Sequence, residues 1–225
     1  MNLQGGKTMG NSVYFIYCVV FIYLIWCAYR LPAHKDLQYR LYLLVLICLF
    51  YDNLISFSGF LIGLGPLLKF LNFLRFAIHV FITPLFCYIV FNIAQSMGIK
   101  IAQGKNAEKV VWVLTLALIA LGFMKELSDI DLVPNVRWGI VKYSQAKPSI
   151  PIAVILVNLF VIITSIAIWR ATGWPVLCIT SIAMFMIAAI PSTKVGQLPG
   201  NAGEIIFAYG FLLAQKRLLK IEHKA

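Results

Sequence analysis

The sequence predicts a polytopic bundle of membrane-spanning α-helices, an all-α fold in a single domain of residues 1–225. Composition is the first reason: 61% of the 225 residues are hydrophobic and 12% are charged, whereas a typical soluble domain is about 45–50% apolar and about 25% charged. Long unbroken apolar runs are the second reason. They favour helices, which satisfy their own backbone hydrogen bonds in lipid, over a β-barrel, which would need strict alternation.

Seven apolar runs approach the length needed to cross about 30 Å of hydrocarbon, which takes about 20 helical residues. The predicted spans cover residues 13–29, 41–64, 70–94, 110–124, 150–169, 174–190 and 202–214. The fourth and seventh runs are short, so we expect each of them to extend into its flanks. The first run has no small-x-small cleavage site before Arg30 and is expected to be a retained span, not a signal peptide.

The distribution of positive charge is the third reason. The formal net charge is +11, but the basic residues lie in short loops between the apolar runs and form no single patch, so nucleic-acid binding is not predicted. When the loops alternate between two sides, one side carries eight of the 19 Lys and Arg residues and the other side carries eleven. This bias predicts a cytoplasmic C-terminus and an external N-terminus in a lipid bilayer.

The segment 125–149 is the one long polar connection between predicted spans. It holds three of the eight acidic residues: Glu126, Asp129 and Asp131. With the predicted topology it lies outside. Two interpretations stay open, an interfacial lid over a cavity or a solvated loop.

Two acids, Asp52 and Glu204, fall inside predicted spans. Ionisable groups in hydrocarbon cost some 2.5–3.5 kcal/mol on insertion scales, so they usually face the bundle interior and mark function. Asp52 lies near the middle of its span, between Tyr51 and Asn53. Glu204 follows Asn201 at a spacing of three residues, which places both on one helix face.

Helix direction predicts that five ionisable side chains meet at one level. Arg75 and His79 share a face at the start of the third span, since they are four residues apart. The third and seventh spans enter from outside and the fourth exits there, so Arg75, His79, Glu204 and Glu126 all lie in the outer half. Asp52 lies at mid-depth below them.

No metal site or cofactor is predicted. An intramembrane zinc hydrolase needs about three His or acid ligands, yet His79 is the one histidine inside a predicted span. A retinal Schiff base needs a lysine in the last span, and residues 202–214 contain none. Aromatic residues are frequent around the polar level, and their faces suit cationic chemistry.

This arrangement resembles the small seven-span terpene cyclases of fungal meroterpenoid and indole-diterpene pathways. Those proteins have a similar length, an acid after an aromatic residue in the second span, and an acid in the seventh. Tyr51-Asp52 and Glu204 occupy the matching places, but with Asp and Glu exchanged, and the Arg75/His79 pair is an addition. The resemblance implies that the acids protonate an epoxide or alkene and direct ring closure of a polyprenyl chain.

The leading hypothesis is therefore a membrane-embedded enzyme that acts on a lipid-like, isoprenoid small molecule by acid–base chemistry. Asp52 is the predicted proton donor and Glu204 the second acid or base. Six residues are predicted to bind or orient the substrate or to tune the two acids: Tyr51, Asn53, Arg75, His79, Glu126 and Asn201. The alternatives are a proton-coupled carrier or lipid-binding protein with an Asp52–His79 relay, and a structural subunit in which Asp52 only neutralises Arg75 or His79.

Overall fold

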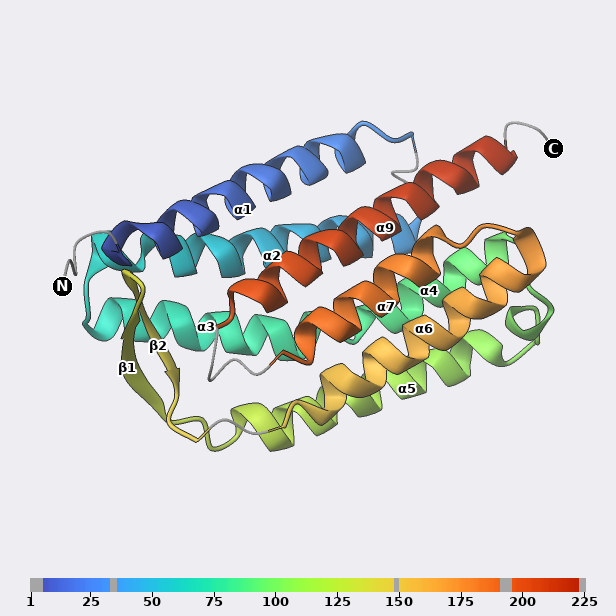
Figure 1. Cartoon of the computed structure of the whole chain (residues 1–225). Coiled ribbons are helices and arrows are strands. Elements are labelled where there is room, and N and C mark those ends of the chain that lie inside the picture. The colour runs from blue at the N-terminus through green and yellow to red at the C-terminus, as the bar shows by residue number, and fades with distance from the viewer. Residues whose placement is uncertain (1–5, 33–35, 148–149, 191–195, 223–225) are drawn as a thin grey trace.

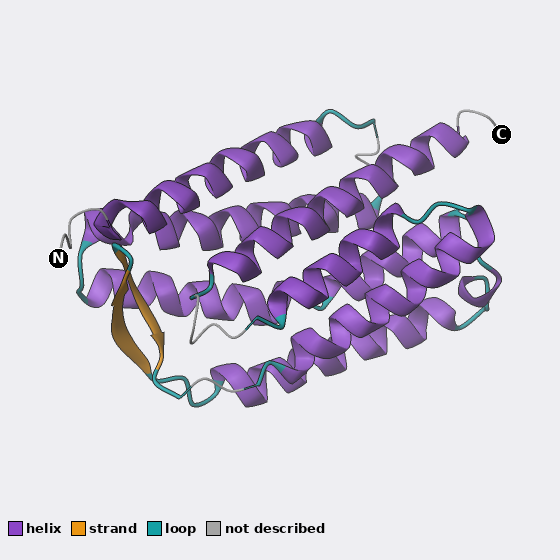
Figure 2. Ribbon diagram, viewed as in Figure 1, coloured by secondary structure: helices purple, strands orange, loops and turns teal. Residues whose placement is uncertain are grey.

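A bundle of helices forms most of the computed structural model, which describes residues 6–32, 36–147, 150–190 and 196–222 (Figure 1). The helices are α1 (Gly6–Tyr29), α2 (Leu37–Ile62), α3 (Pro66–Ile82), α4 (Leu85–Ser96), α5 (Ala107–Gly122), α6 (Ile152–Thr172), α7 (Val176–Ala188) and α9 (Leu198–Glu222). A 3₁₀ turn (Lys100–Ala102) precedes α5, and a π-helical turn (Phe123–Leu127) continues it. The predicted helical bundle is confirmed, with one addition, a hairpin of strands β1 (Leu132–Arg137) and β2 (Ile140–Gln145) (Figure 2).

Five of the described helical segments are long and apolar enough to cross a membrane. They are Gly10–Tyr29, Leu37–Ile62, Pro66–Ser96, Ala107–Leu127 and Ile152–Thr172. α7 has 13 residues, which makes it roughly 20 Å long at the helical rise. α9 is longer but more polar towards its C-terminus. The chain thus has the features of a multi-pass membrane protein, with five clear spans in its described part.

The helix bounds differ from the predicted spans at two informative places. The third predicted span is two helices, because Pro84 has no N–H to donate and the helix breaks at Thr83 and Pro84 before α4 begins. The fourth span extends into the π-helical turn, and the seventh extends in both directions to fill α9, as expected for short runs.

Large apolar side chains cover much of the outer surface of the bundle. Leu61, Val113 and Ile163 are 67–69% exposed on three different helices. A monomeric soluble protein seldom exposes extended apolar surface, so these side chains are placed to meet lipid.

The main core lies where α2, α4 and α9 approach one another. α1 packs on α2 and α9, α7 joins α9 to α6, and α4 contacts α2, α5 and α6. The Phe86 ring of α4 lies 4.6 Å from the Phe207 ring and 4.8 Å from the Phe211 ring of α9. These aromatic contacts fix α9 against the centre of the bundle.

The hairpin lies across one end of the bundle, beside the ends of α1, α2 and α3 (Figure 1). Its turn residues Trp138 and Gly139 have φ values of 52° and 80°, as in the two-residue turns that match the twist of paired strands. Leu132 and Tyr143 are buried against Ile55 of α2 and Leu68 of α3. For residues 132–145 the solvated-loop interpretation is therefore wrong, because apolar side chains pack the two strands onto the helices.

Two glycines let the hairpin approach the helices closely. Gly10 donates its backbone N–H to the Trp138 carbonyl at 3.2 Å, and Asn11 Nδ2 donates to the Gly139 carbonyl at 3.0 Å. A Cβ atom on Gly59 of α2 would lie 1.7 Å from the Val141 carbonyl oxygen. The backbone of the hairpin thus packs directly against the helices. Backbone atoms cannot move aside as the end of a flexible side chain can.

Gly59→Ala is expected to destabilise the protein by about 1–3 kcal/mol, because the added methyl group overpacks a site closed by the β2 backbone. Thermal unfolding in detergent would measure the loss, and hydrogen exchange of the hairpin amides would localise it. Gly104→Ala is the matched control, since its Cβ would meet Ala107 at an ordinary 3.7 Å. Equal stability of the two variants would contradict the close hairpin contact.

Candidate functional site

An ion pair between α2 and α3 is the centre of the candidate site. Arg75 Nε lies 2.7 Å from Asp52 Oδ1, and the side chains are 3% and 19% exposed. Asp52 lies within an apolar helix, where an unpaired charge is costly. A buried partner of opposite charge offsets that cost. Of the two partners considered from the sequence, the structure thus pairs Asp52 with Arg75, not with His79.

The remaining guanidinium nitrogens of Arg75 are also bonded. Nη1 donates to Ser56 Oγ at 3.2 Å and to Asn72 Oδ1 at 3.0 Å. Nη2 donates to Gln197 Oε1 at 3.0 Å, just before α9 begins. Arg75 therefore ties α2, α3 and the turn before α9 together through one planar group.

Asn201 connects the same centre to α9. Its Nδ2 donates to Asp52 Oδ2 at 2.7 Å and to Asn53 Oδ1 at 3.2 Å. Asn53 in turn donates to the Leu49 carbonyl at 2.8 Å. Both oxygens of Asp52 thus accept bonds from donors, which arranges this carboxyl group as an acceptor more than as a proton donor.

Glu204 lies one helical turn beyond Asn201 on α9. Its Oε2 is buried and has no hydrogen-bond partner among the described residues. The hydroxyl of Tyr14 in α1 lies near the same centre, where it interacts with Ser56 and, electrostatically, with Asp52, Arg75 and Glu204. Buried polar atoms are normally satisfied, so an unpartnered carboxyl oxygen is where a ligand hydroxyl or a water would bind.

His79 and Glu126 meet on the other side of the ion pair. Asp52, Arg75 and His79 line a cavity of about 20 Å³. His79 and Glu126 line a second cavity of about 10 Å³, and Glu126 lies in the π-helical turn, a feature frequent at functional sites. Each cavity has room for about one water molecule. Glu204 lines neither of these two cavities, but it interacts electrostatically with Asp52 and Arg75.

Tyr51 lies on the hairpin side of α2. Its hydroxyl donates to the Leu71 carbonyl at 3.1 Å, and its ring packs in the small apolar cluster around Tyr143. The structure therefore gives Tyr51 a packing contact between α2 and α3, with its hydroxyl bonded to backbone.

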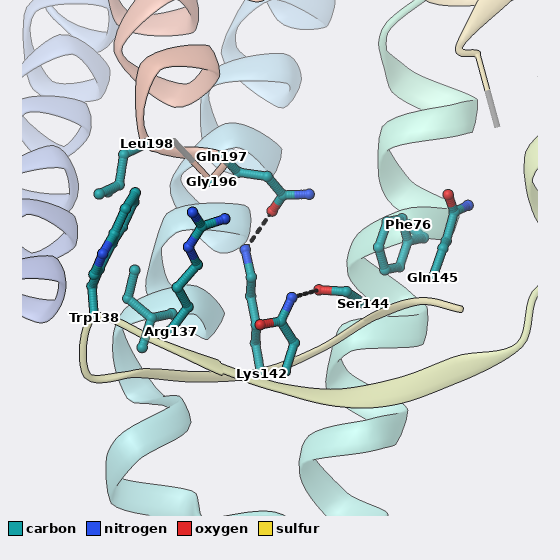
Figure 3. A pocket seen from close by; sticks show the side chains of 11 residues that line it. Phe76, Arg137, Trp138, Lys142, Ser144, Gln145, Gly196, Gln197 and Leu198 are labelled. Atoms are coloured by element: carbon teal, nitrogen blue, oxygen red, sulfur yellow. Dashed lines mark hydrogen bonds between the residues drawn. The ribbon is translucent and has the colours of Figure 1, made fainter. Parts of the chain in front are cut away.

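A larger polar cavity of about 210 Å³ lies between the hairpin, α3 and the turn that precedes α9 (Figure 3). Lys142 of β2, 7% exposed, reaches across it and donates to Gln197 Oε1 at 2.7 Å. Burial, and then the positive charge of Arg75, lower the pKa of Lys142 to about 7, while Asp52 acts in the opposite direction. Gln197 thus joins this cavity to the ion pair, because one oxygen accepts from both Lys142 and Arg75.

Lys142 and Gln197 are functional candidates that the sequence did not reveal. Lys142 lies in the polar segment 125–149, in which no strand was predicted. The alternation of Val141 and Tyr143 with Lys142 and Ser144 is nevertheless a short strand pattern. Gln197 lies in a polar connection and carries no sequence signal of its own.

Comparison with protein-family models and with curated proteins finds no match for this chain. The fold defines the class of this protein. It is a multi-pass helical membrane protein with a buried ion pair and a hairpin-covered cavity that polar side chains line.

Proposed function

We propose that the protein is a membrane-embedded enzyme that acts on a lipid-like, isoprenoid substrate by acid–base chemistry. The observation that carries the proposal is the buried, unpartnered Oε2 of Glu204, one turn from the Asp52–Arg75–Asn201 network. A proton on this oxygen breaks no existing bond, whereas a proton on Asp52 would compete with Arg75 or Asn201. Glu204 is thus the proposed proton donor, and Asp52 is the fixed negative charge that holds Arg75 and Asn201.

The proposed reaction is an isomerisation. A proton adds to an epoxide oxygen or an alkene carbon of the polyprenyl chain, a carbon–carbon bond forms as the cation is captured, and a proton leaves a neighbouring carbon. No oxidant, reductant or second substrate is needed, because the product has the same atoms as the substrate.

The reaction is tested by incubating the purified protein in detergent with geranylgeranyl substrates that carry a terminal epoxide or alkene. Mass spectrometry should detect a cyclised isomer of unchanged mass. In heavy water, protonation of the alkene substrate should add one deuterium to carbon. If the folded protein leaves both substrates unchanged, the proposed function is wrong.

The membrane arrangement proposed for this enzyme has seven spans, with α7 and α9 as the sixth and seventh. The N-terminus is outside and the C-terminus is in the cytoplasm, which puts the hairpin outside. The excess of Lys and Arg in the loops opposite the hairpin supports this orientation. An external signal from a reporter fused after Lys224 would show that the orientation is opposite to the one proposed.

A structural clamp is the second candidate, and the saturated bonding of Arg75 favours it. All of its polar nitrogens bond to groups on α2, α3 or the turn before α9. Such a network stabilises helix packing whether or not a reaction takes place. The two candidates differ in what they require of Glu204, whose Oε2 has no hydrogen-bond partner among the described residues.

A further inference from the structure

The cavity beneath the hairpin is positively charged. Its described lining residues are Phe76, Asn135, Arg137, Trp138, Ile140, Lys142, Ser144, Gln145, Gly196, Gln197 and Leu198, of which two are cations and none is an acid. Arg137 and Lys142 project from adjacent strands towards the turn at Gly196–Leu198 (Figure 3). Two cations held on one side of a small cavity are suited to an anion.

The charge of Lys142 is not balanced within the cavity. Its bonded partner, Gln197 Oε1, is neutral and also accepts from Arg75. Asp52 bonds to Arg75 directly and is not among the described residues that line the cavity. A buried ammonium that has only a neutral acceptor gains most from a ligand that brings negative charge.

The hairpin turn holds Arg137 in place. The guanidinium carbon of Arg137 lies 4.5 Å from the centre of the Trp138 ring, a cation–π distance. Trp138 has φ of 52°, which is rare for a bulky residue, and a Cβ on Gly196 would meet its ring at 3.3 Å. The Trp138 ring thus packs on the guanidinium of Arg137, a planar group of the kind that binds phosphate with two parallel bonds.

The start of α9 adds a third favourable feature. Gly196, Gln197 and Leu198 line the cavity, and α9 begins at Leu198 with no acid in its first turn. The N-terminus of a long helix carries a partial positive charge and free backbone N–H groups, both of which favour anions. Cations from β1 and β2 and a helix start therefore face the same space.

We propose that this cavity binds the phosphate group of an anionic amphiphile, with Lys142 and Arg137 as its ligands. This assignment rests on the proposed function, since it names the substrate class: an isoprenoid that carries a phosphate or diphosphate at one end. The cavity, at about 210 Å³, is smaller than the roughly 300–1,000 Å³ typical of pockets for whole drug-sized molecules. It therefore takes the head of the amphiphile and leaves the chain outside it.

Helix α9 connects the anion site with Glu204, the proposed acid. Gln197, Asn201 and Glu204 lie at spacings of four and three residues, which places them on one helix face. Seven residues of helix correspond to roughly 10 Å. A phosphate held at Gln197 thus leaves the reacting carbon roughly 10 Å away along the chain, so the headgroup is retained through the reaction.

The test is direct binding in dodecyl maltoside, a detergent without phosphate, with geranylgeranyl phosphate, geranylgeraniol and inorganic phosphate as probes. Geranylgeranyl phosphate should bind and raise the unfolding temperature, and the alcohol should bind far more weakly. Lys142→Gln and Arg137→Gln should each weaken binding by about one to two orders of magnitude, the value of a charge-assisted bond. Arg170→Gln removes an exposed cation at the end of α6 and is the matched control.

Equal binding of alcohol and phosphate would overturn the anion site, and so would unchanged affinity in Lys142→Gln. Equal affinity for inorganic phosphate would overturn the amphiphile assignment. Lys142→Arg keeps the charge and should keep binding, which guards against a variant that fails to fold. Because binding needs no turnover, a protein that binds the phosphate but yields no product retains the anion site and loses the proposed reaction.

The pH dependence gives an independent readout. Among the described residues, Arg75 and Asp52 act electrostatically on Lys142, and Arg137 lines the same cavity. Since the lowered pKa of Lys142 is about 7, its ammonium is charged below that pH and loses its proton as pH rises. The second ionisation of a phosphate ester has a pKa of about 6 and is mostly complete by pH 7, so affinity should fall between pH 7 and 9. Lys142→Arg should abolish this fall, and an equally steep fall in that variant would contradict the role of Lys142.

Discussion

Asp52→Asn is expected to lower the free energy of unfolding by about 3–5 kcal/mol, because it leaves Arg75 as a buried charge without a counter-ion. Arg75 is 3% exposed and its Nε points at Asp52 from 2.7 Å. The neutral acceptors Ser56, Asn72 and Gln197 remain, but none of them carries a negative charge. Chemical or thermal unfolding in detergent would measure the loss, with Asp129→Asn, an exposed acid near the hairpin, as control.

A double-mutant cycle separates the ion pair from other effects of the substitution. Arg75→Met alone should also destabilise the protein, because Asp52 then lacks its cation. The double variant Asp52→Asn/Arg75→Met should lose much less than the sum of the two, since no unpaired charge is left. Additive losses would mean that the two side chains are not coupled, which is incompatible with a clamp between α2 and α3.

The sequence predicts the level of the polar centre well because helix direction alone determines it. Asp52, Arg75 and Asn201 meet as expected from the order in which α2, α3 and α9 cross the bundle. Charge inside an apolar run is a strong signal, since each such residue needs a partner. The pairing of Asp52 with Arg75 follows from this rule, and the choice of Arg75 over His79 depends on side-chain direction that spacing does not give.

The hairpin is the part of the fold that the sequence did not predict. Strands of six residues give a weak alternation signal, and Pro134 lies within β1. The turn has Trp138 at positive φ, where Asn or Asp is usual. Its docking depends on the close approach to Gly59 of α2, a tertiary contact that no local pattern contains. The sequence pattern therefore did not indicate that Lys142 is buried, whereas the hairpin buries it.

A bonded polar network around Asp52 and Arg75 does not by itself make an enzyme, so the role of Glu204 decides between the two proposed functions. In the clamp, Glu204 contributes no hydrogen bond through Oε2, and replacing it with the isosteric amide should leave stability unchanged or higher. In the enzyme, the same atom carries the proton that starts the reaction.

Glu204→Gln is therefore expected to lower turnover by about 10²–10⁴-fold, the usual contribution of general acid–base catalysis, while the protein stays folded. An amide cannot supply the proton, yet it has nearly the same shape as the carboxyl group, so binding of geranylgeranyl phosphate should persist. Product formation, unfolding temperature and ligand affinity would be measured on the same preparation. Glu108→Gln, which replaces an exposed acid at the start of α5, should change none of them. Full turnover in a folded Glu204→Gln protein would rule out Glu204 as the donor. Unchanged or higher stability of this variant, without any detectable reaction in the parent protein, would assign the site to helix packing.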